Sequence, residues 1–381
     1  MFTIFPHPAA FATAGLLLLG ACSTPAESLS APTAADPAAA AEAGGGATTS
    51  DSAVFDSTYV HEISVEFDAT EYLAMVDAYA QTGEKEWIEA TVTIDGTTYE
   101  NVGLRLKGNS SLFGLTTDGT SSAQGLSADR PEELPWLIRL DKYVDDQNHD
   151  GVVDFVVRSN NTETSLNEAV ALDLLEAAGL AAQDAIAVRF SVNGGEESLR
   201  LVIEHPDDVW MEENLDGDGA LYKAESTGDY SYRGDDPDSY DEVFDQEAGD
   251  DNADLTPLID FLDVVNNSDD VTFAAEIGNW LDTDSFATYL AMQDLIDNLD
   301  DIVGPGNNSY LYYDPGAGQF TVVPWDHNLA FGVTNAGGGG VGGPGGERPT
   351  GDLATDDLPA APGELPAGQP RPSPGDVGPG A

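Results

Sequence analysis

Residues Asp294–Gly332, DLIDNLDDIVGPGNNSYLYYDPGAGQFTVVPWDHNLAFG, decide how we interpret the rest of the chain. The β-forming run SYLYY is separated from the run QFTVVPW by a Gly-containing turn, which is typical of a β-hairpin. Asp300 and Asp301 precede the first strand, and Asp326 follows the second. Pairing of the strands would bring these carboxylates to one end of the hairpin, where a metal ion or a phosphate group could lie between them.

Ordinary turn chemistry also explains this pattern. The chain has 69 acidic residues among 381, so carboxylates near strand ends arise by chance. Asn and Gly are common in turns because they adopt turn conformations easily. The hairpin residues by themselves therefore leave a functional site and a structural turn open.

Two motifs in this segment, NLDDIVGPGNNSYLYYD and PWDHNLAFG, are similar to the end of the spore coat protein H (CotH) kinase family, a group of atypical protein kinases. Upstream, RLKGNSS and LVIEH followed by LYK resemble the same family in the same order, so the resemblance covers roughly residues 55–332. It implies an α+β fold, namely a two-lobed atypical protein kinase-like domain with a β-rich N-lobe and a mostly helical C-lobe.

The resemblance also implies a reaction, the transfer of the γ-phosphoryl group of ATP to a Ser or Thr hydroxyl of a protein substrate. In that scheme Asp300 is the catalytic residue that orients or deprotonates the hydroxyl, and Asn308 and Asp326 hold Mg²⁺ or Mn²⁺. Asp301 and Asn307 are the adjacent alternatives. One departure from the family pattern follows in WDHN, where Asn replaces the second acid of the WDxD form.

Three further residues are expected to bind the cofactor ATP. Lys107 begins the turn KGNSS, whose small residues let backbone N–H groups approach an anion, where the family has a nucleotide-covering loop. Lys142 lies near the end of the expected strand WLIRLDKY, and Glu168 belongs to the helix SLNEAVALDLLEAAG. Glu168 has two explanations: a capping box with Ser165, or a partner that holds Lys142 as in kinases.

The segments outside residues 55–335 are not expected to belong to the kinase-like domain. Residues 1–22 have an apolar core ending in LGAC, which predicts a lipoprotein signal peptide whose Cys22 carries the lipid anchor to the membrane. Residues 23–54 and 336–381 are rich in Ala, Ser, Gly and Pro, which predicts a disordered linker and a disordered tail. The protein is thus expected to be exported and anchored at the cell surface.

The net charge of −56, with only 13 Lys and Arg, argues against nucleic acid as a partner, because nucleic-acid binding depends on basic side chains. It leaves a second function open, that of a non-catalytic surface or coat-like structural protein that keeps the fold and binds Ca²⁺. Two loops are weak matches to a calcium-binding pattern. One contains Asn214, Asp216, Asp218 and Glu225, and the other contains Asp146, Asn148 and Asp150.

Patterns along the chain also predict individual elements. Alternation predicts a strand over Tyr59–Phe67, and helical spacing follows over Ala69–Gln81. Asp95-Gly96 and Asn193-Gly194 each predict the turn of a β-hairpin. Helices are expected within residues 254–297.

Overall fold

The computed structural model describes residues 53–122, 124–215, 219–225, 228–249, 254–304 and 307–333. The expected signal peptide with Cys22, nearly all of the linker 23–54, the tail 336–381, and Asp216 and Asp218 of one candidate calcium loop lie outside these residues. The expected linker is two residues too long, because Val54 is buried in a 3₁₀ helix (Ala53–Phe55) that begins the folded part.

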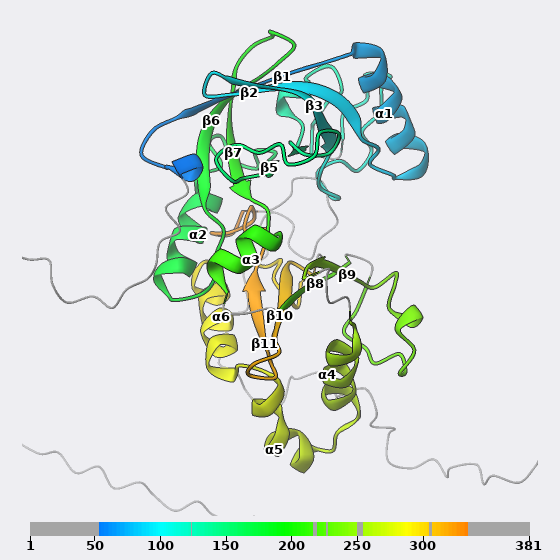
Figure 1. Cartoon of the computed structure of the whole chain (residues 1–381), viewed down its shortest axis with the longest axis vertical. Coiled ribbons are helices and arrows are strands. Elements are labelled where there is room, and N and C mark those ends of the chain that lie inside the picture. The colour runs from blue at the N-terminus through cyan, green and yellow to red at the C-terminus, as the bar shows by residue number, and fades with distance from the viewer. Residues whose placement is uncertain are drawn as a thin grey trace, which may run out of the picture. The chain divides into compact units, whose positions relative to one another are not determined.

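The first half of the described chain forms a closed barrel (Figure 1). Its strand order is β1-β2-β3-β4-β5-β7-β6, and the parallel pairing of β1 with β6 closes it. The strands are β1 (His61–Phe67), β2 (Ile88–Ile94), β3 (Thr97–Leu106), β4 (Trp136–Arg139), β5 (Asp154–Val157), β6 (Ala185–Val192) and β7 (Ser198–Glu204). Alternate residues of these strands point inward and fill the barrel with aliphatic and aromatic side chains.

The two expected hairpin turns are confirmed. Asp95 and Gly96 have φ of 45° and 84° between β2 and β3, and Asn193 and Gly194 have φ of 51° and 65° between β6 and β7. Such turns need positive φ at both central residues, which Asn, Asp and Gly tolerate best.

The helix α1 (Ala69–Thr82) lies beside the barrel, and its limits follow from its sequence (Figure 1). The side chain of Asp68 accepts hydrogen bonds from the backbone N–H groups of Thr70 and Glu71, which caps the first turn. Gly83, with φ of 81°, ends the helix in the left-handed conformation. The expected strand and helix before residue 83 are both confirmed.

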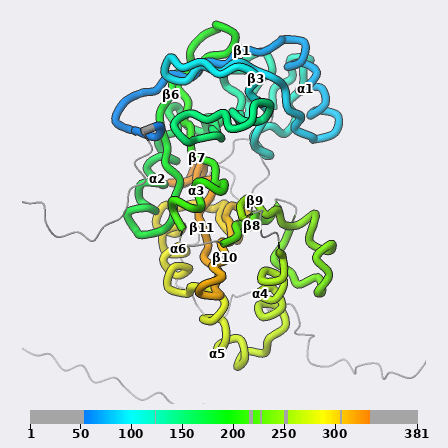
Figure 2. The backbone as a smooth tube through the Cα atoms, viewed as in Figure 1, coloured from blue at the N-terminus to red at the C-terminus, as the bar shows by residue number. Residues whose placement is uncertain are grey.

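The second half of the described chain contains a four-stranded sheet of order β11-β10-β8-β9. Its strands are β8 (Ala220–Ala224), β9 (Phe244–Ala248), β10 (Ser309–Asp314) and β11 (Gln319–Pro324). The helices α4 (Thr256–Asn267), α5 (Asp270–Trp280) and α6 (Thr283–Leu295) accompany it, and Figure 2 traces the backbone through them. The mixed α+β class is confirmed. The expected helices of this half are joined by a four-stranded sheet, because β10 pairs with the distant β8 as well as with β11.

Two further helices are α2 (Leu166–Ala177), which lies between β5 and β6 in the sequence, and the short α3 (Asp208–Asn214), which lies between β7 and β8. The expected capping box at the start of α2 is wrong. Ser165 has a left-handed φ of 54° and its side chain makes no capping hydrogen bond, while the Glu168 side chain turns into the protein. Within the described residues, none of the helices is long and apolar enough to cross a membrane.

Candidate functional site

The β10–β11 hairpin brings the expected site residues to one end, as its sequence predicts. Ser309 pairs with Pro324, so Asn308 directly precedes the paired strands and Trp325 and Asp326 directly follow them. Asn308 and Trp325 are buried, and the Asp326 side chain keeps a relative exposure of 26%. The carboxylate of Asp326, which follows the buried Trp325, is therefore accessible to a ligand.

The loop that carries Asp300 folds tightly back toward this end. The backbone N–H of Asn308 donates to the carbonyl of Asp301 over 3.3 Å. Gly304 packs on the backbone of Asp300 so closely that a Cβ there would lie 2.7 Å from the Asp300 Cα atom. The loop therefore needs glycine at position 304 to keep Asp300 near the hairpin end.

A chain of buried side chains links Asp300 to the turn after β11. His327 is buried, and burial lowers its pKa to about 4, so its ring is neutral and Nε2 accepts from Gln293 Nε2 at 3.0 Å. Gln293 Oε1 accepts from Asn298 Nδ2 at 2.8 Å, and Asn298 Oδ1 accepts from the backbone N–H of Asp300 at 3.4 Å. Asp300 and the Asp326–His327 turn are thus held in a fixed relation.

Asp326 forms an ion pair with Arg158, which follows strand β5 of the barrel. The same guanidinium contacts Glu168 of α2, with Nε donating to Oε2 at 2.9 Å and Nη2 lying 2.8 Å from Oε1. Burial opposes the charge of Arg158, but Asp326 and Glu168 together raise its pKa above the ordinary arginine value. Burial raises the pKa of Glu168, and Arg158 counteracts it.

A second arginine, Arg200, holds the backbone of Arg158 in place. Arg200 is buried, and burial lowers its pKa to about 10. Its Nε donates to the carbonyl of Arg158 at 2.9 Å, and its other nitrogens donate to the carbonyls of Glu132 at 2.7 Å and Leu134 at 3.1 Å. The backbone of Arg158 is therefore held by a guanidinium whose partners are neutral carbonyls.

Lys107 lies just after β3, next to the hairpin end. Its Nζ atom is 3.0 Å from His205 Nε2 and 5.6 Å from the centre of the Trp325 ring. Burial lowers the pKa of Lys107 to about 8. The sequence-predicted cofactor residue Lys107 is therefore close to the residue that precedes Asp326.

The expected pair of Lys142 and Glu168 is a wrong prediction, because Glu168 pairs with Arg158 instead. Lys142 lies in the turn after β4, with its Nζ atom 5.1 Å from the centre of the Trp87 ring. Strand β4 is shorter than expected and ends at Arg139, so position 142 leaves the sheet before it can reach α2. A role for Lys142 in cofactor binding stays a prediction.

The side chains of the adjacent alternatives, Asp301 and Asn307, make hydrogen bonds to the backbone of the surrounding loops. Asp301 Oδ1 accepts from the backbone N–H of Val303 at 3.0 Å. Asn307 Nδ2 donates to the carbonyl of Glu225 at 2.7 Å, and the Asn307 carbonyl accepts from Lys223 Nζ at 2.7 Å. Among the charges that act on Lys223 are those of Asp326 and Asp300, so this lysine lies near both carboxylates of the site.

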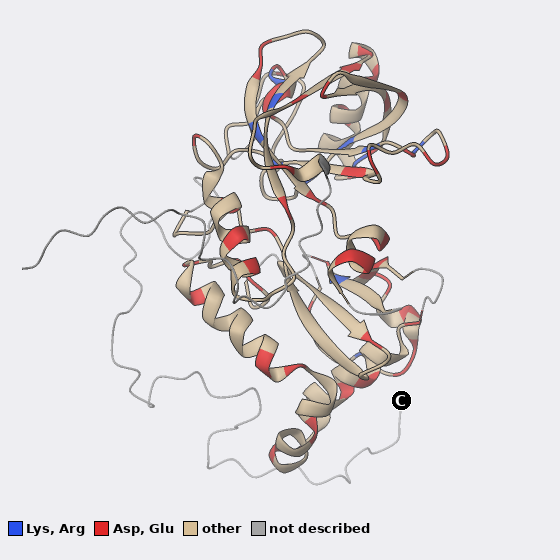
Figure 3. Cartoon of the chain, turned by 60° about the vertical axis from the view of Figure 1, so that its left-hand side comes forward, with Lys and Arg blue, Asp and Glu red and all other residues tan. Residues whose placement is uncertain are grey.

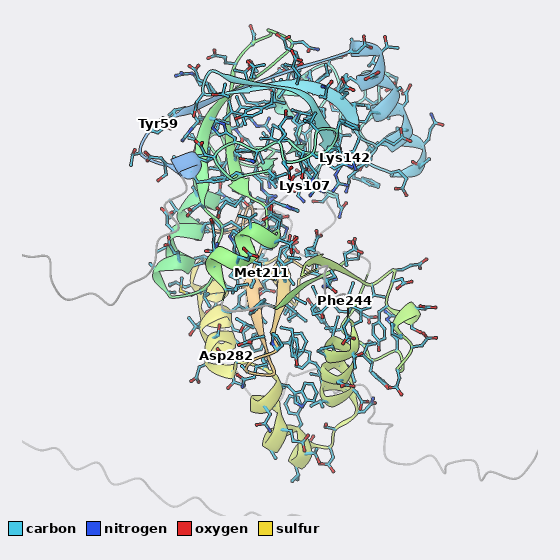
Figure 4. All side chains as sticks on the ribbon, viewed as in Figure 1. Tyr59, Lys107, Lys142, Met211, Phe244 and Asp282 are labelled. Atoms are coloured by element: carbon cyan, nitrogen blue, oxygen red, sulfur yellow. The ribbon has the colours of Figure 1, made fainter. Side chains whose placement is uncertain are left out.

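Positive charge is concentrated here although the chain is strongly acidic. Figure 3 shows a few basic segments among many acidic ones, and Figure 4 shows Lys107 and Lys142 on the side of the barrel nearest β8 and β9. Direct contacts and electrostatic interactions connect seven of the thirteen basic residues of the chain, namely Lys85, Arg105, Lys107, Arg139, Lys142, Arg158 and Lys223. Lysine and arginine side chains are the groups that bind phosphate oxygens in proteins.

The donor atoms fit a sparse magnesium site. In the described part of the chain, no group of three or more His, Cys, Asp or Glu side chains could hold a metal ion by itself. Mg²⁺ is commonly held by one or two carboxylates together with the phosphates of its substrate. Asp326 with the amide oxygen of Asn308 suits that mode and does not suit a calcium cage. In the second candidate calcium loop, Asn148 uses its side chain on its own turn, donating to the carbonyl of Asp146 and accepting from the N–H of Gly151.

Sequence reasoning missed several residues that the structure gathers at the site: Arg158, Lys223, Asp154 and Trp325. The scarcity of basic residues is the signal that could have found the first two. The same scarcity pointed to Lys142, and it applies equally to each remaining Lys and Arg of the domain.

Comparison with known proteins supports the resemblance seen in the motifs. No curated protein matches the chain. The family model described as CotH kinase protein matches residues 104–359, which is more than half of the 381 residues. The match includes the whole RLKGNSS motif, the Arg158–Glu168 pair and the whole β10–β11 hairpin. The chain therefore belongs to the CotH kinase protein family.

Proposed function

We propose that this protein is an ATP-dependent kinase that transfers the γ-phosphoryl group to Ser or Thr hydroxyls of a protein substrate. One observation carries the proposal: in a chain with net charge −56, the basic side chains of Lys107, Arg158 and Lys223 lie at the hairpin end. Arg158 pairs with Asp326 there, and Lys223 interacts with both Asp326 and Asp300. Phosphoryl transfer needs this combination of cations for the phosphates, oxygen ligands for a divalent ion and a carboxylate near the attacking hydroxyl.

In the proposed arrangement, the barrel and the part built on the second sheet correspond to the two lobes of a kinase. Lys107 and Arg158, both beside Trp325, face the phosphates, with Lys142 and the other cations around Trp87 further out. Asn308 and Asp326 would hold Mg²⁺ or Mn²⁺, which when bound neutralises charge on the phosphates. Asp300 orients the acceptor hydroxyl and accepts its proton.

Glu168 has a positioning role in this proposal. It holds Arg158, and Arg158 in turn fixes the carboxylate of Asp326. The pair thus replaces the Lys–Glu pair of ordinary kinases with an Arg–Glu pair that reaches the carboxylate proposed to bind the metal.

Location is part of the same proposal. The apolar segment ending at Cys22 supports export as a lipid-anchored surface protein, and the strongly acidic composition supports a partner other than nucleic acid. The alternative, a non-catalytic Ca²⁺-binding surface protein, predicts that Ca²⁺ and not ATP with Mg²⁺ stabilises the fold.

The test compares two aspartates with different proposed roles. Asp326→Ala removes a charged ligand, so Mg²⁺-dependent ATP binding and phosphoryl transfer should both be lost. Asp300→Asn should keep ATP affinity while transfer falls by roughly 10²-fold or more, the range for loss of positioned base catalysis. Transfer is measured with γ-labelled ATP and binding by calorimetry.

Asp260→Asn, a matched change on the exposed surface of α4, is the control and should behave like wild type. Transfer that survives in both Asp300→Asn and Asp326→Ala would show that the hairpin end has only a structural role.

A further inference from the structure

A row of polar contacts leads from Arg139 through Asp154 and His205 to Lys107. Of these four residues, the proposed reaction assigns a role at the Trp325 ring only to Lys107. Arg139 binds both carboxylate oxygens of Asp154, with Nε donating to Oδ1 at 2.8 Å. Asp154 Oδ2 lies 3.2 Å from His205 Nδ1, and His205 Nε2 lies 3.0 Å from Lys107 Nζ. Asp154 and His205 are buried, at 2% and 7% exposure, so water does not satisfy these groups.

The partners decide where the protons of this row are. The Lys107 ammonium can only donate, so His205 Nε2 must accept and its proton must be on Nδ1, facing Asp154. Asp154 is a carboxylate, since hydrogen bonds from Arg139 and His205 lower its pKa although burial alone would raise it. Only the neutral imidazole with its proton on Nδ1 satisfies both neighbours.

The charges around the two basic groups come from several strands. Lys107 interacts with Glu247 of β9, Asp154 of β5, Arg105 of β3 and Arg158 after β5. His205 interacts with Lys107, Asp154 and Glu247, and also with Asp207, which lies just before α3. Burial and then the nearby Lys107 charge lower the pKa of His205, so the ring stays neutral near pH 7.

We propose that His205 is a positioning residue for Lys107, and that protonation of His205 switches off phosphate binding by this lysine. A charged imidazole has no acceptor to offer and places a second cation 3.0 Å from the ammonium. Lys107 must then leave its place beside Trp325. This inference deepens the proposed function, on which it rests.

The test is the pH dependence of KM for ATP and of kcat, measured on the full chain from pH 5 to pH 8. His205→Gln keeps an acceptor for Lys107 and a donor for Asp154 but cannot be charged, so its KM should equal that of wild type at pH 7.5 and should lack the acid rise. His205→Leu should raise KM about tenfold or more at every pH, because a hydrogen bond to a charged group is lost. In both variants kcat should change less than KM.

His149→Gln is the matched control, because His149 lies elsewhere in the barrel, 2.8 Å from the Tyr99 hydroxyl. It should follow the wild-type profile. Titration of ATP itself is common to all variants and cancels in the comparison. An acid rise of KM that persists unchanged in His205→Gln, or a His205→Leu variant with wild-type KM, overturns the role of His205.

Failure of the proposed function looks different, because the wild type would then transfer no phosphoryl group. In that case binding of inorganic tripolyphosphate is titrated over the same pH range. Binding lost in acid by wild type and kept by His205→Gln supports the switch. Equal loss in both, or no binding by either, overturns it.

Discussion

Glu204, at the end of strand β7, shows how one buried carboxyl sets a pH dependence of stability. Burial raises the pKa of Glu204 to about 8, although the backbone N–H of Asp184 donates to its Oε2 at 2.7 Å. The unfolded chain ionises this group near pH 4.5, whereas the folded chain keeps its proton until about pH 8. The folded state therefore loses stability as the pH rises through this window, by an amount on the order of a few kcal/mol.

Glu204→Gln should remove this loss. The amide is neutral at every pH and can still accept from Asp184, so the variant should have a higher Tm than wild type at pH 8.5 and nearly the same Tm at pH 4.5. Thermal unfolding of both proteins across this range measures it. Glu212→Gln on the exposed surface of α3 should leave the profile unchanged, and an equal profile for Glu204→Gln would contradict the prediction.

Among the elements, strand β3 has a glycine, Gly103, at the position where the turn after β4 packs against it. A Cβ on Gly103 would lie 2.5 Å from Lys142 Cβ and 3.0 Å from Trp87 Cε3. Gly103→Ala should therefore push Lys142 off the Trp87 ring and destabilise the fold by about 1–3 kcal/mol, the usual cost of overpacking. Chemical denaturation measures this difference.

A double-mutant cycle separates this clash from a general intolerance of β3. Lys142→Gly removes the two nearest atoms, so Gly103→Ala should cost clearly less in that background. Equal costs in both backgrounds would show that Lys142 does not limit position 103.

How far the elements could be predicted depends on the range of the interactions that form them. The hairpins at Asp95-Gly96 and Asn193-Gly194 are decided by two adjacent residues that accept positive φ, so their sequence predicts them. The pairing of β1 with β6 joins residues more than 120 positions apart, and no local pattern encodes it. The same holds for the site, where the local motif predicted the hairpin end but could not show that Arg158 reaches Asp326.

The cap of α2 failed for a related reason. Ser165 and Glu168 have the spacing of a capping box, but the Glu168 carboxylate binds the buried guanidinium of Arg158 instead of the start of the helix. A local propensity is thus overruled where a buried charge needs a partner.

At the scale of the whole molecule, the charge of −56 means that the folded state repels itself. Salt shortens the screening length from about 30 Å at 0.01 M to about 3 Å at 1 M. The Tm should therefore rise with NaCl over this range, and choline chloride should act alike, because screening depends on ionic strength. A Tm that responds only to millimolar Ca²⁺ would instead favour specific cation sites.

The closure of the barrel has a mechanical consequence. β1 is the first strand of the folded part, and it is paired along its length with β2 on one side and β6 on the other. A pulling force applied to the chain ahead of His61 acts along β1, so both ladders are loaded in shear and their hydrogen bonds share the load. At the other end, the backbone N–H groups of Phe331 and Gly332 hold the chain to Ile296 and Asp297, and these contacts can peel one after the other. When the domain is stretched between its two ends, the C-terminal contacts should therefore break first, while β1 stays paired with β2 and β6.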